Sequence, residues 1–535
     1  MKTTTADVVI IGSGASAGPC AFKLAQSGLK VTVLEKGDWR DQELNPEDEF
    51  AEIHLERHRP SDSLDPTVVI SGEKISASTR VGQSFYLVGG GTVRYTATSW
   101  RLRAKDFLKK TNYGSVEGCS IEDWPITYEE LEPYYTQAEK MVGISGLSGA
   151  DPTEPFRSQN HLMPPLKEDN FQKLLVPAAK KLGLNPFPIP VAIHSEANAA
   201  RNAEQCMQCG WCSGFPCRFS AKSSVDVVIY PLLKKTKGFT LKTHAYATKI
   251  VSKGKKIEGV EYLNLKSSKK EFIKAKYVIV AASAIQSARL LLLSKIANSS
   301  GLVGKNLMFH IEAKASALFP TEQFHQAYYK KTGINDFYFP GKKDGFINHR
   351  SIQSGSKAPP ISFSLSRKGF GAEFAKGLAK DFLHVQELQA MVEDLPQENN
   401  RITLSADKKD PWGLPVPEVY HTYHEQDRRA IMATLEQMKK LLEASGGINI
   451  ETPKEAPRSI VDRYTWHLMG TARMGNDPTK SVVNKFCQSH DLENLFITDG
   501  SVFPTSGGLN PTLTMQALSL RTADRILELF KGKKT

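Results

Sequence analysis

The sequence lacks any apolar run that approaches the ~20 residues of a membrane span. Its N-terminal apolar run is interrupted by Asp7 and is only a strand's length before glycine, so we expect no signal peptide. Long basic tracts are absent too: basic residues exceed acidic ones by 12, but the lysines lie in short scattered pairs. We therefore expect a cytoplasmic protein with no membrane span and no nucleic-acid partner.

Cysteine is also scarce, with seven residues in a chain of 535. An odd number in a chain without a signal peptide argues against a disulfide framework. A hydrophobic content of 40% with 24% charged residues is ordinary for a globular protein. Because the chain is too long for one simple core, we expect two domains.

The clearest pattern lies in the first forty residues. The β-branched run at residues 7–11 predicts a buried parallel strand. A glycine-rich turn follows, then a helical segment at residues 18–27 and a second strand at residues 30–34 that ends in Glu35. This order is that of a βαβ unit with an acidic residue at the tip of its second strand.

The turn itself fits the dinucleotide-binding pattern G-x-G-x-x-G/A. Gly12 would make the tight turn, Gly14 would let the backbone approach a pyrophosphate, and Ala17 would keep the helix close to the sheet. The carboxylate of Glu35 would accept the two hydroxyls of an adenosine ribose. Residues 88–92 contain three further consecutive glycines, so Gly90, Gly91 and Thr92 predict a second close approach to the same cofactor.

Later segments predict the rest of the architecture. Thr127 with Glu130 forms a capping box for a helix that runs to about Val142. Residues 239–282 are β-rich, and residues 311–455 change character, with aromatics and apolar–polar alternation at residues 361–365. We assign this second region, alternation included, to a domain built on a sheet and closed by an amphipathic helix at residues 427–445.

The chain resembles the GMC (glucose–methanol–choline) flavin oxidoreductases along nearly its whole length. The N-terminal βαβ unit looks like the FAD site of that family, and residues 88–92 look like its second glycine block. The most specific similarity is C-terminal, in Trp466-His-Leu-Met-Gly-Thr-Ala-Arg-Met-Gly475, then Asn494-Leu-Phe-Ile-Thr-Asp-Gly500, then Asn510-Pro-Thr-Leu-Thr514. The order and spacing of these three blocks are hard to produce by chance.

The resemblance implies an α/β fold with a Rossmann-type FAD-binding domain (GMC/p-hydroxybenzoate hydroxylase-like) and a substrate domain on an antiparallel sheet. It assigns residues 1–150, 200–310 and 456–535 to the first domain and residues 151–199 and 311–455 to the second. It also implies that His467 is the catalytic base, since a neutral imidazole can take a hydroxyl proton near pH 7. Asn510 would be its partner at the substrate oxygen.

The same resemblance implies four further cofactor contacts, at Asp499, Gly500, Pro511 and Thr512. Some members of the family attach FAD covalently through a histidine in the second glycine block. The matching residue here is Arg94, so we expect FAD to be bound non-covalently.

Four cysteines form one dense run, Cys206, Cys209, Cys212 and Cys217. Its spacing approaches that of iron–sulfur ligands without matching it. An iron–sulfur relay, a zinc site and reduced cysteines packed beside the flavin all remain open. A similar block followed by Ala-Lys-x-Ser occurs in gluconate and sugar dehydrogenases of the family, which favours a dehydrogenase over an oxidase.

The resemblance implies FAD-dependent oxidation of an alcohol group on a sugar, amino sugar or polyol, with hydride transfer to flavin N5. One alternative is an oxygen-using oxidase, for example one that tailors an aminoglycoside in antibiotic biosynthesis. Another is the flavoprotein subunit of a membrane-docked sugar or gluconate dehydrogenase. The substrate, the electron acceptor (oxygen, quinone or redox protein) and the oligomeric state are not fixed by the sequence.

Overall fold

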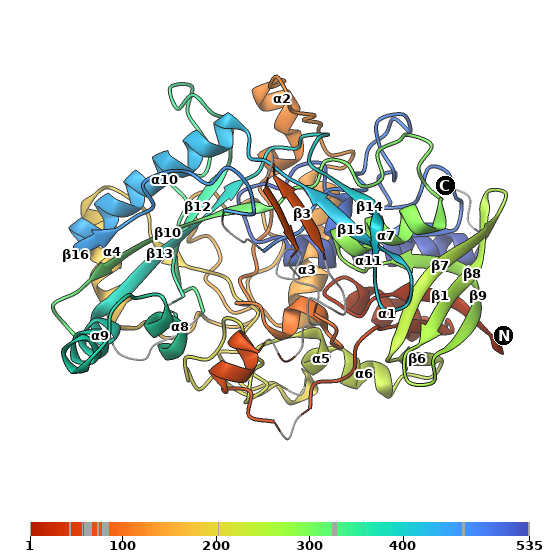
Figure 1. The fold of residues 1–535 in the computed structure, drawn as a ribbon, viewed down its shortest axis with the longest axis horizontal. Helices are drawn as coiled ribbons and strands as arrows, with labels where there is room; N and C mark the ends of the chain where they lie inside the picture. The colour runs from red at the N-terminus through yellow and green to blue at the C-terminus, as the bar shows by residue number, and fades with distance from the viewer. Residues whose placement is uncertain are drawn as a thin grey trace.

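The computed structural model describes residues 2–41, 44–55, 57, 67–71, 74–77, 85–201, 203–323, 329–356, 358–462 and 466–532. Within them, three sheets are spread along the long axis of the molecule (Figure 1). The strands of the first sheet and both chain termini lie at one end, and the strands of the second sheet lie at the other.

The first sheet has the order β6-β2-β1-β9-β8-β7, with β17 paired to β9. β6, β2, β1, β9 and β17 run parallel, whereas β7, β8 and β9 form an antiparallel meander. The strands are β1 (Lys2–Ile11), β2 (Val31–Leu34), β6 (Phe239–Lys242), β7 (Ala245–Lys253), β8 (Lys256–Asn264), β9 (Lys269–Val280) and β17 (Leu495–Ile497). This topology confirms the predicted βαβ unit, and its parallel strands end at one common edge.

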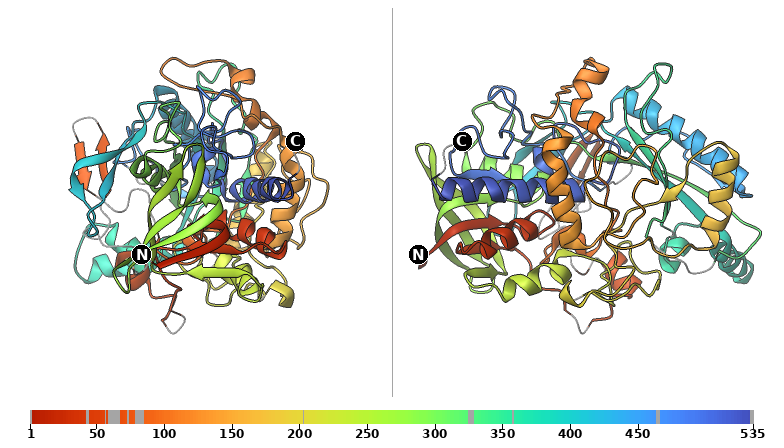
Figure 2. Two further views of the ribbon diagram at one scale, coloured as in Figure 1. Left: turned by 90° about the vertical axis from the view of Figure 1, so that its right-hand side faces the viewer. Right: turned by 180° about the vertical axis from the view of Figure 1, so that it is seen from behind.

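Helices cover this sheet. α11 (Thr512–Phe530) contacts both α1 (Ala17–Gln26) and α3 (Tyr128–Val142), as Figure 2 shows from behind. The predicted capping box of α3 is confirmed, because the Thr127 side chain accepts from the Glu130 N–H and the Glu130 carboxylate accepts from the Thr127 N–H. The remaining helices here are α5 (Val225–Val228), α6 (Tyr230–Lys234) and α7 (Ala284–Ser294).

The second sheet is antiparallel and has the order β16-β10-β13-β12-β11-β5. Its strands are β5 (Phe187–Pro188), β10 (His310–Leu318), β11 (Thr332–Ile334), β12 (Arg350–Ser354), β13 (Val385–Glu393) and β16 (Ile448–Glu451). The predicted amphipathic helix is α10 (Glu425–Ala444), which lies across this sheet and also contacts α4 (Asn170–Lys181). An α/β fold with a second, antiparallel sheet was the expected architecture.

A smaller sheet has the order β14-β15-β3-β4 and lies between the other two (Figure 1). Its strands are β3 (Val68–Ser71), β4 (Lys74–Ala77), β14 (Arg401–Lys409) and β15 (Pro415–Tyr420). The helices not yet placed are α2 (Lys109–Tyr113), α8 (Pro360–Leu365) and α9 (Ala372–His384). None of the helices in the described residues is long and apolar enough to cross a membrane.

One predicted strand is wrong. The alternating residues 361–365 belong to the short helix α8, in which Pro360 occupies a first-turn position and Phe363 packs edge-on against Phe382 of α9. Proline fixes a helical φ and lacks an N–H that the first turn leaves unused anyway, so it starts a helix well. Five alternating residues are too few to outweigh that start signal.

Candidate active site

Two histidines from distant segments meet side by side. His310 begins β10, and His467 lies in the irregular segment that pairs with it through Met308 and Met469. The Nδ1 atoms of the two rings are 2.8 Å apart, and the rings lie nearly perpendicular to each other. His310 is fully buried and His467 is partly buried, so the protons on their facing nitrogens are set mainly by their hydrogen-bond partners.

The hydrogen bonds fix which nitrogen carries the proton. His310 Nε2 lies 2.8 Å from the Gly507 carbonyl and 3.3 Å from that of Ser506, so it must donate. In neutral His310, Nδ1 is then the acceptor, and His467 Nδ1 must supply the N–H. It follows that Nε2 of neutral His467 has no proton and is free to accept one.

Asn510 completes the arrangement. Its Oδ1 accepts from Trp100 Nε1 at 3.0 Å and from Gln353 Nε2 at 3.2 Å, so its Nδ2 must face the other way. That Nδ2 lies 3.3 Å from His467 Nε2. An amide donor therefore lies beside an unprotonated imidazole nitrogen and donates to it, and these are the two groups needed to hold a hydroxyl group and take its proton.

Burial and nearby charge keep His467 neutral. Burial is the main reason that its pKa lies well below the usual value of 6.5, and the charges of His310 and Lys330 lower that pKa further. Burial also lowers the pKa of His310 to about 4. Both rings are neutral near pH 7, as the hydrogen-bond assignment requires.

Close backbone packing holds the His467 segment. His467 has a φ of +63°, a conformation that non-glycine residues rarely adopt. A Cβ on Gly470 would meet the Asn306 carbonyl oxygen at 1.8 Å, and one on Gly500 would meet the Leu468 carbonyl oxygen at 2.4 Å. These two glycines let the segments pack backbone against backbone, and Gly470 N–H donates to the Gly500 carbonyl.

The predicted nucleotide-binding residues gather at the common edge of the parallel strands. Ser13 Oγ and the Gly37 N–H both donate to the Glu35 carboxylate. A Cβ on Gly12, at φ +98°, would clash with the Ala281 carbonyl, whereas one on Gly14 would point into open space. Gly14 is thus not required by packing within the protein, which leaves the approach of a ligand as the reason for it.

The second glycine block lies against the first. A Cβ on Gly90 would come within 3.2 Å of the Gly14 Cα, and one on Gly91 would meet nothing within 4 Å. Thr92 Oγ1 donates to the Gly89 carbonyl and accepts from the Val225 N–H.

The other predicted residues are also placed around this edge. Ala17 is the first residue of α1 and is buried. Asp499 follows β17 and accepts from the hydroxyls of Ser287 and Ser501. Pro511 is the N-cap of α11 and Thr512 is its first residue, so the N-terminus of that helix directly follows Asn510.

Buried polar atoms without a partner test whether FAD, the implied cofactor, fits here. Five such hydroxyls occur in the described part of the chain, and they include the hydroxyls of Tyr230, Ser283 and Thr498. Burial raises the pKa of the Tyr230 phenol, and the charge of Glu35 raises it further, while Ser283 follows β9 and Thr498 follows β17. Because buried polar groups are normally hydrogen-bonded, these orphans fit a polar ligand along the strand ends. The residues present therefore suit FAD.

The cysteine run packs behind the second glycine block, where Gly214 and Arg94 exchange hydrogen bonds. Lys222 is fully buried and donates to the carbonyls of Tyr95, Cys212 and Phe215. Among the described residues, which include all four cysteines of the run, no group of three or more His, Cys, Asp or Glu side chains is arranged to hold a metal ion. The structure thus does not support the iron–sulfur and zinc interpretations.

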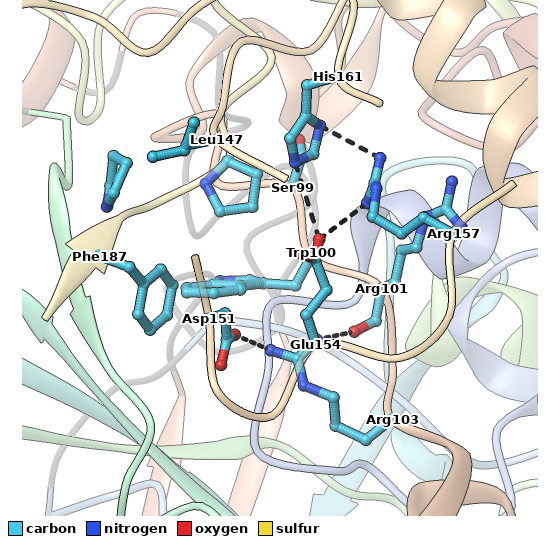
Figure 3. A pocket seen from close by; sticks show the side chains of 12 residues that line it. Ser99, Trp100, Arg101, Arg103, Leu147, Asp151, Glu154, Arg157, His161 and Phe187 are labelled. Atoms are coloured by element: carbon cyan, nitrogen blue, oxygen red, sulfur yellow. Dashed lines mark hydrogen bonds and ion pairs between the residues drawn. The ribbon is translucent and has the colours of Figure 1, made fainter. Parts of the chain in front are cut away.

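We call the contacting residues Trp100, His310, Gln353, His467 and Asn510 the catalytic cluster. Figure 3 shows a small pocket that shares Trp100 with this cluster. Phe187 packs edge-on against the indole, with ring centroids 5.7 Å apart. The arginines that line the pocket are paired with carboxylates: Arg101 with Glu132 and Glu139, Arg103 with Asp151, and Arg157 with Glu139 and Glu154. We interpret this pocket as part of the support for Trp100, because its charges are already neutralised.

Three residues of the catalytic cluster were not found from the sequence: Trp100, His310 and Gln353. Each lies more than 150 positions from its partner, and no local pattern marks them. By contrast, the dinucleotide-binding turn and the C-terminal blocks are each marked by a pattern of nearby residues in the sequence.

Comparison with known proteins gives a consistent picture. Residues 87–312 and 396–519 match the two parts of the family described as GMC oxidoreductase, and residues 7–42 match an FAD binding domain. The 2-methyl-1,2-propanediol dehydrogenase of Mycolicibacterium austroafricanum is 34% identical, over 99% of this chain and 97% of its own length.

Two further relatives differ in the chemistry that their names state. The fructose dehydrogenase large subunit of Gluconobacter japonicus is 31% identical, over 99% of both chains. The paromamine 6'-oxidase of Streptomyces fradiae is 29% identical, over 97% of this chain and 91% of its own. Among solved structures, pyridoxine 4-oxidase from Mesorbium loti has a TM-score of 0.67 at 16% identity, over 97% of this chain and 99% of its own, which shows a shared fold.

Proposed function

This chain belongs to the GMC oxidoreductase family, FAD-dependent enzymes that act on alcohols, and we propose that it is a dehydrogenase of a sugar, amino sugar or other polyol. In this proposal residues 1–150, 200–310 and 456–535 form the FAD-binding domain, and residues 151–199 and 311–455 form the substrate domain. A cytoplasmic location stays a prediction.

The observation that carries the proposal is the tautomer of His467. Its Nε2 carries no proton and accepts a hydrogen bond from the Asn510 amide at 3.3 Å. A substrate hydroxyl that lies against both groups would donate its proton to His467 Nε2 and accept from Asn510 Nδ2. FAD, when bound, accepts the hydride from the carbon that carries this hydroxyl group.

His467 and Asn510 then have separate tasks. His467 takes the hydroxyl proton, and its Nδ1–H bond to His310 keeps Nε2 aimed at the substrate. Asn510 stabilises the negative charge that develops on the oxygen, because Trp100 and Gln353 hold its amide in one orientation. Burial disfavours the imidazolium that results, so His467 releases the proton again before the next turnover.

The cofactor is proposed to be held non-covalently by Gly12, Gly14, Ala17, Glu35, Gly90, Gly91, Thr92, Asp499, Gly500, Pro511 and Thr512. The resemblance puts Arg94 at the attachment position of the histidine, and the contacts of Arg94 with the Gly214 carbonyl and Glu52 support a structural role for it. Acid or heat should release the flavin. Flavin that stays with the denatured chain would contradict this part of the proposal.

The electron acceptor separates the main proposal from its alternatives. Two of the relatives named above are dehydrogenases, which supports an acceptor other than oxygen, while the third is an oxidase. The name of the fructose relative, a large subunit, keeps open a flavoprotein subunit that docks on a membrane partner.

An anaerobic screen tests the proposal. Oxidised holoprotein is mixed with sugars, amino sugars and polyols under nitrogen, and bleaching of the flavin bands identifies a substrate. Reoxidation by a dye or quinone is then compared with reoxidation by oxygen. Rapid reoxidation by oxygen alone would favour the oxidase, and no bleaching by any polyhydroxy compound would exclude the proposed substrate class.

A further inference from the structure

The second sheet has two contrasting faces, because successive side chains of a strand point to opposite sides. Ile311, Ala313 and Ala315 of β10 and Ile352 of β12 pack in one apolar cluster with α10. Figure 1 shows α10 lying across these strands. The alternate residues of β10 and β12 therefore lie on the opposite side of the sheet, which we call the polar face.

The polar face carries part of the catalytic cluster. His310 of β10 contacts His467, and Gln353 of β12 contacts Asn510. Further members of the polar face on β10, β12 and β13 are Glu312, Ser351 and Gln389. A substrate held by His467 and Asn510 therefore lies next to the polar face.

The contacts of Gln353 fix the orientation of its side-chain amide. Trp100 Nε1 can only donate, so Asn510 Oδ1 is an acceptor and the Gln353 atom 3.2 Å from it is Nε2. Ser351 Oγ donates to the Gly508 carbonyl at 2.8 Å, so it accepts from the same Nε2 at 3.0 Å. Both protons of Nε2 are thus used within the protein.

The other amide atom, Gln353 Oε1, is left without a donor. It is buried and has no hydrogen-bond partner in the described part of the chain, and Gln353 is 0% exposed. Gly333 of β11 lies beside Gln353 in register, and a Cβ there would meet ring carbons of Phe187 at 2.7 Å and Trp100 at 3.0 Å. Because Trp100 Nε1 already donates to Asn510, these rings supply no donor to Oε1.

A buried carbonyl oxygen without a donor is costly, unless a ligand supplies one. Since Gln353 Nε2 contacts Asn510 directly, Oε1 lies one amide group away from the residue proposed to hold the reacting oxygen. The nearest second donor that a polyol offers is the hydroxyl on the adjacent carbon.

We propose that Gln353 Oε1 accepts a hydrogen bond from this second hydroxyl, so that the enzyme selects vicinal diols over simple alcohols. Gln353 then has two tasks: its Nε2 orients Asn510, and its Oε1 recognises the substrate. A β-strand between two neighbours is a rigid support for such recognition. This inference rests on the proposed function and narrows its substrate class.

The experiment compares propane-1,2-diol with propan-1-ol and propan-2-ol, which each lack one of its two hydroxyls. Oxidised holoenzyme is mixed with each probe under nitrogen. Perturbation of the flavin spectrum gives the dissociation constant, and stopped-flow gives the rate of flavin reduction. We expect the diol to be favoured by about 10- to 100-fold in rate over dissociation constant, because either monoalcohol leaves Oε1 unpartnered.

Gln353→Met removes both amide atoms. Every probe should then react more slowly, because Asn510 loses a support, and the preference for the diol should disappear. Ser351→Ala is the matched control, because it removes the second acceptor of Nε2 and keeps Oε1. Trp100→Phe is another, because it also removes a donor to Asn510. Both controls should lower the rates and retain the diol preference.

FAD content and the thermal midpoint show whether each variant folds, and Gln353→Leu replaces Gln353→Met if the latter does not. No preference for the diol in either binding or reduction by the wild-type protein would overturn the inference. The same holds for a preference that Gln353→Met retains, or for loss of FAD from this variant with the preference unchanged, which would assign Oε1 to the cofactor.

The outcomes for the inference and for the proposed function can be told apart. Flavin reduction by larger polyols without any diol preference would contradict the inference and leave the proposed function intact. A Gln353-dependent diol preference in binding, in a protein whose flavin no alcohol reduces, would support the inference and contradict the proposed function.

Discussion

The nucleotide-binding edge and the catalytic cluster are assembled in opposite ways. At the edge, Ser13, Glu35 and Gly37 come from one stretch of the chain and contact one another directly. The catalytic cluster draws its members from five separate segments, and they are Trp100, His310, Gln353, His467 and Asn510. The glycine-rich turn and its acid are thus positioned within one local unit, whereas the catalytic cluster depends on the whole fold being in place.

If the two regions act separately, a change in one should leave the other intact. The largest effect is expected for His467→Ala, which removes the proposed base. Flavin reduction by the identified substrate should slow by about 10²- to 10⁴-fold. Anaerobic stopped-flow measures the rate, and His384→Ala, a histidine outside the cluster, is the control. A variant that reduces its flavin at nearly the wild-type rate would show that the mechanism is wrong.

A smaller loss is expected for His310→Ala, because His310 positions His467 without touching the substrate. Loss of the Nδ1 contact frees the His467 ring and its tautomer, so reduction should slow by roughly 10- to 100-fold. His310→Gln should recover much of the rate, since an amide can donate to the Gly507 carbonyl and accept from His467. If the alanine and glutamine variants are equally slow, His310 has a packing role only.

Glu35→Ala tests the nucleotide-binding edge while leaving the catalytic cluster unchanged. It should weaken FAD binding by about tenfold, because a charged acceptor for the ribose is lost. The fraction that still holds FAD should be reduced by substrate at the wild-type rate. Glu493→Ala, an exposed acid on the surface, serves as control. Wild-type retention of FAD would mean that Glu35 has been misassigned.

The smallest effect concerns pH. Protonated His467 cannot act as a base, so flavin reduction should fall as the pH drops through the pKa of that ring. Burial and the nearby positive charge hold this pKa well below 6.5, so the fall should begin below pH 6.5 and the rate should be level above it. His467→Ala should lose the dependence. A fall in the rate of flavin reduction that begins at pH 6.5 or above would contradict a pKa of His467 held below 6.5 by its environment.

The sequence predicted elements whose signals are local. The glycine-rich turn before α1, the Thr127 capping box of α3 and the amphipathic pattern of α10 each lie within about twenty residues. The failure at residues 361–365 was local too, because a proline start outweighed a short alternation.

His467 and Asn510 were inferred from the family resemblance. The residues that hold them in place were not inferred from the sequence. His310 and Gln353 became recognisable only when β10 and β12 were placed side by side with the C-terminal segments.

The two-faced second sheet has an evolutionary consequence. Ile311, Ala313 and Ala315 of β10 pack in one apolar cluster with α10, while the alternate residues His310 and Glu312 lie on the opposite face, on which His310 contacts His467, so few positions serve both purposes. Selection can therefore alter position 312 and its neighbour on the same face, position 389, while positions 311, 313 and 315 preserve stability. A small library at positions 312 and 389 should yield folded enzymes with new preferences, and divergence among relatives that share this fold should concentrate there.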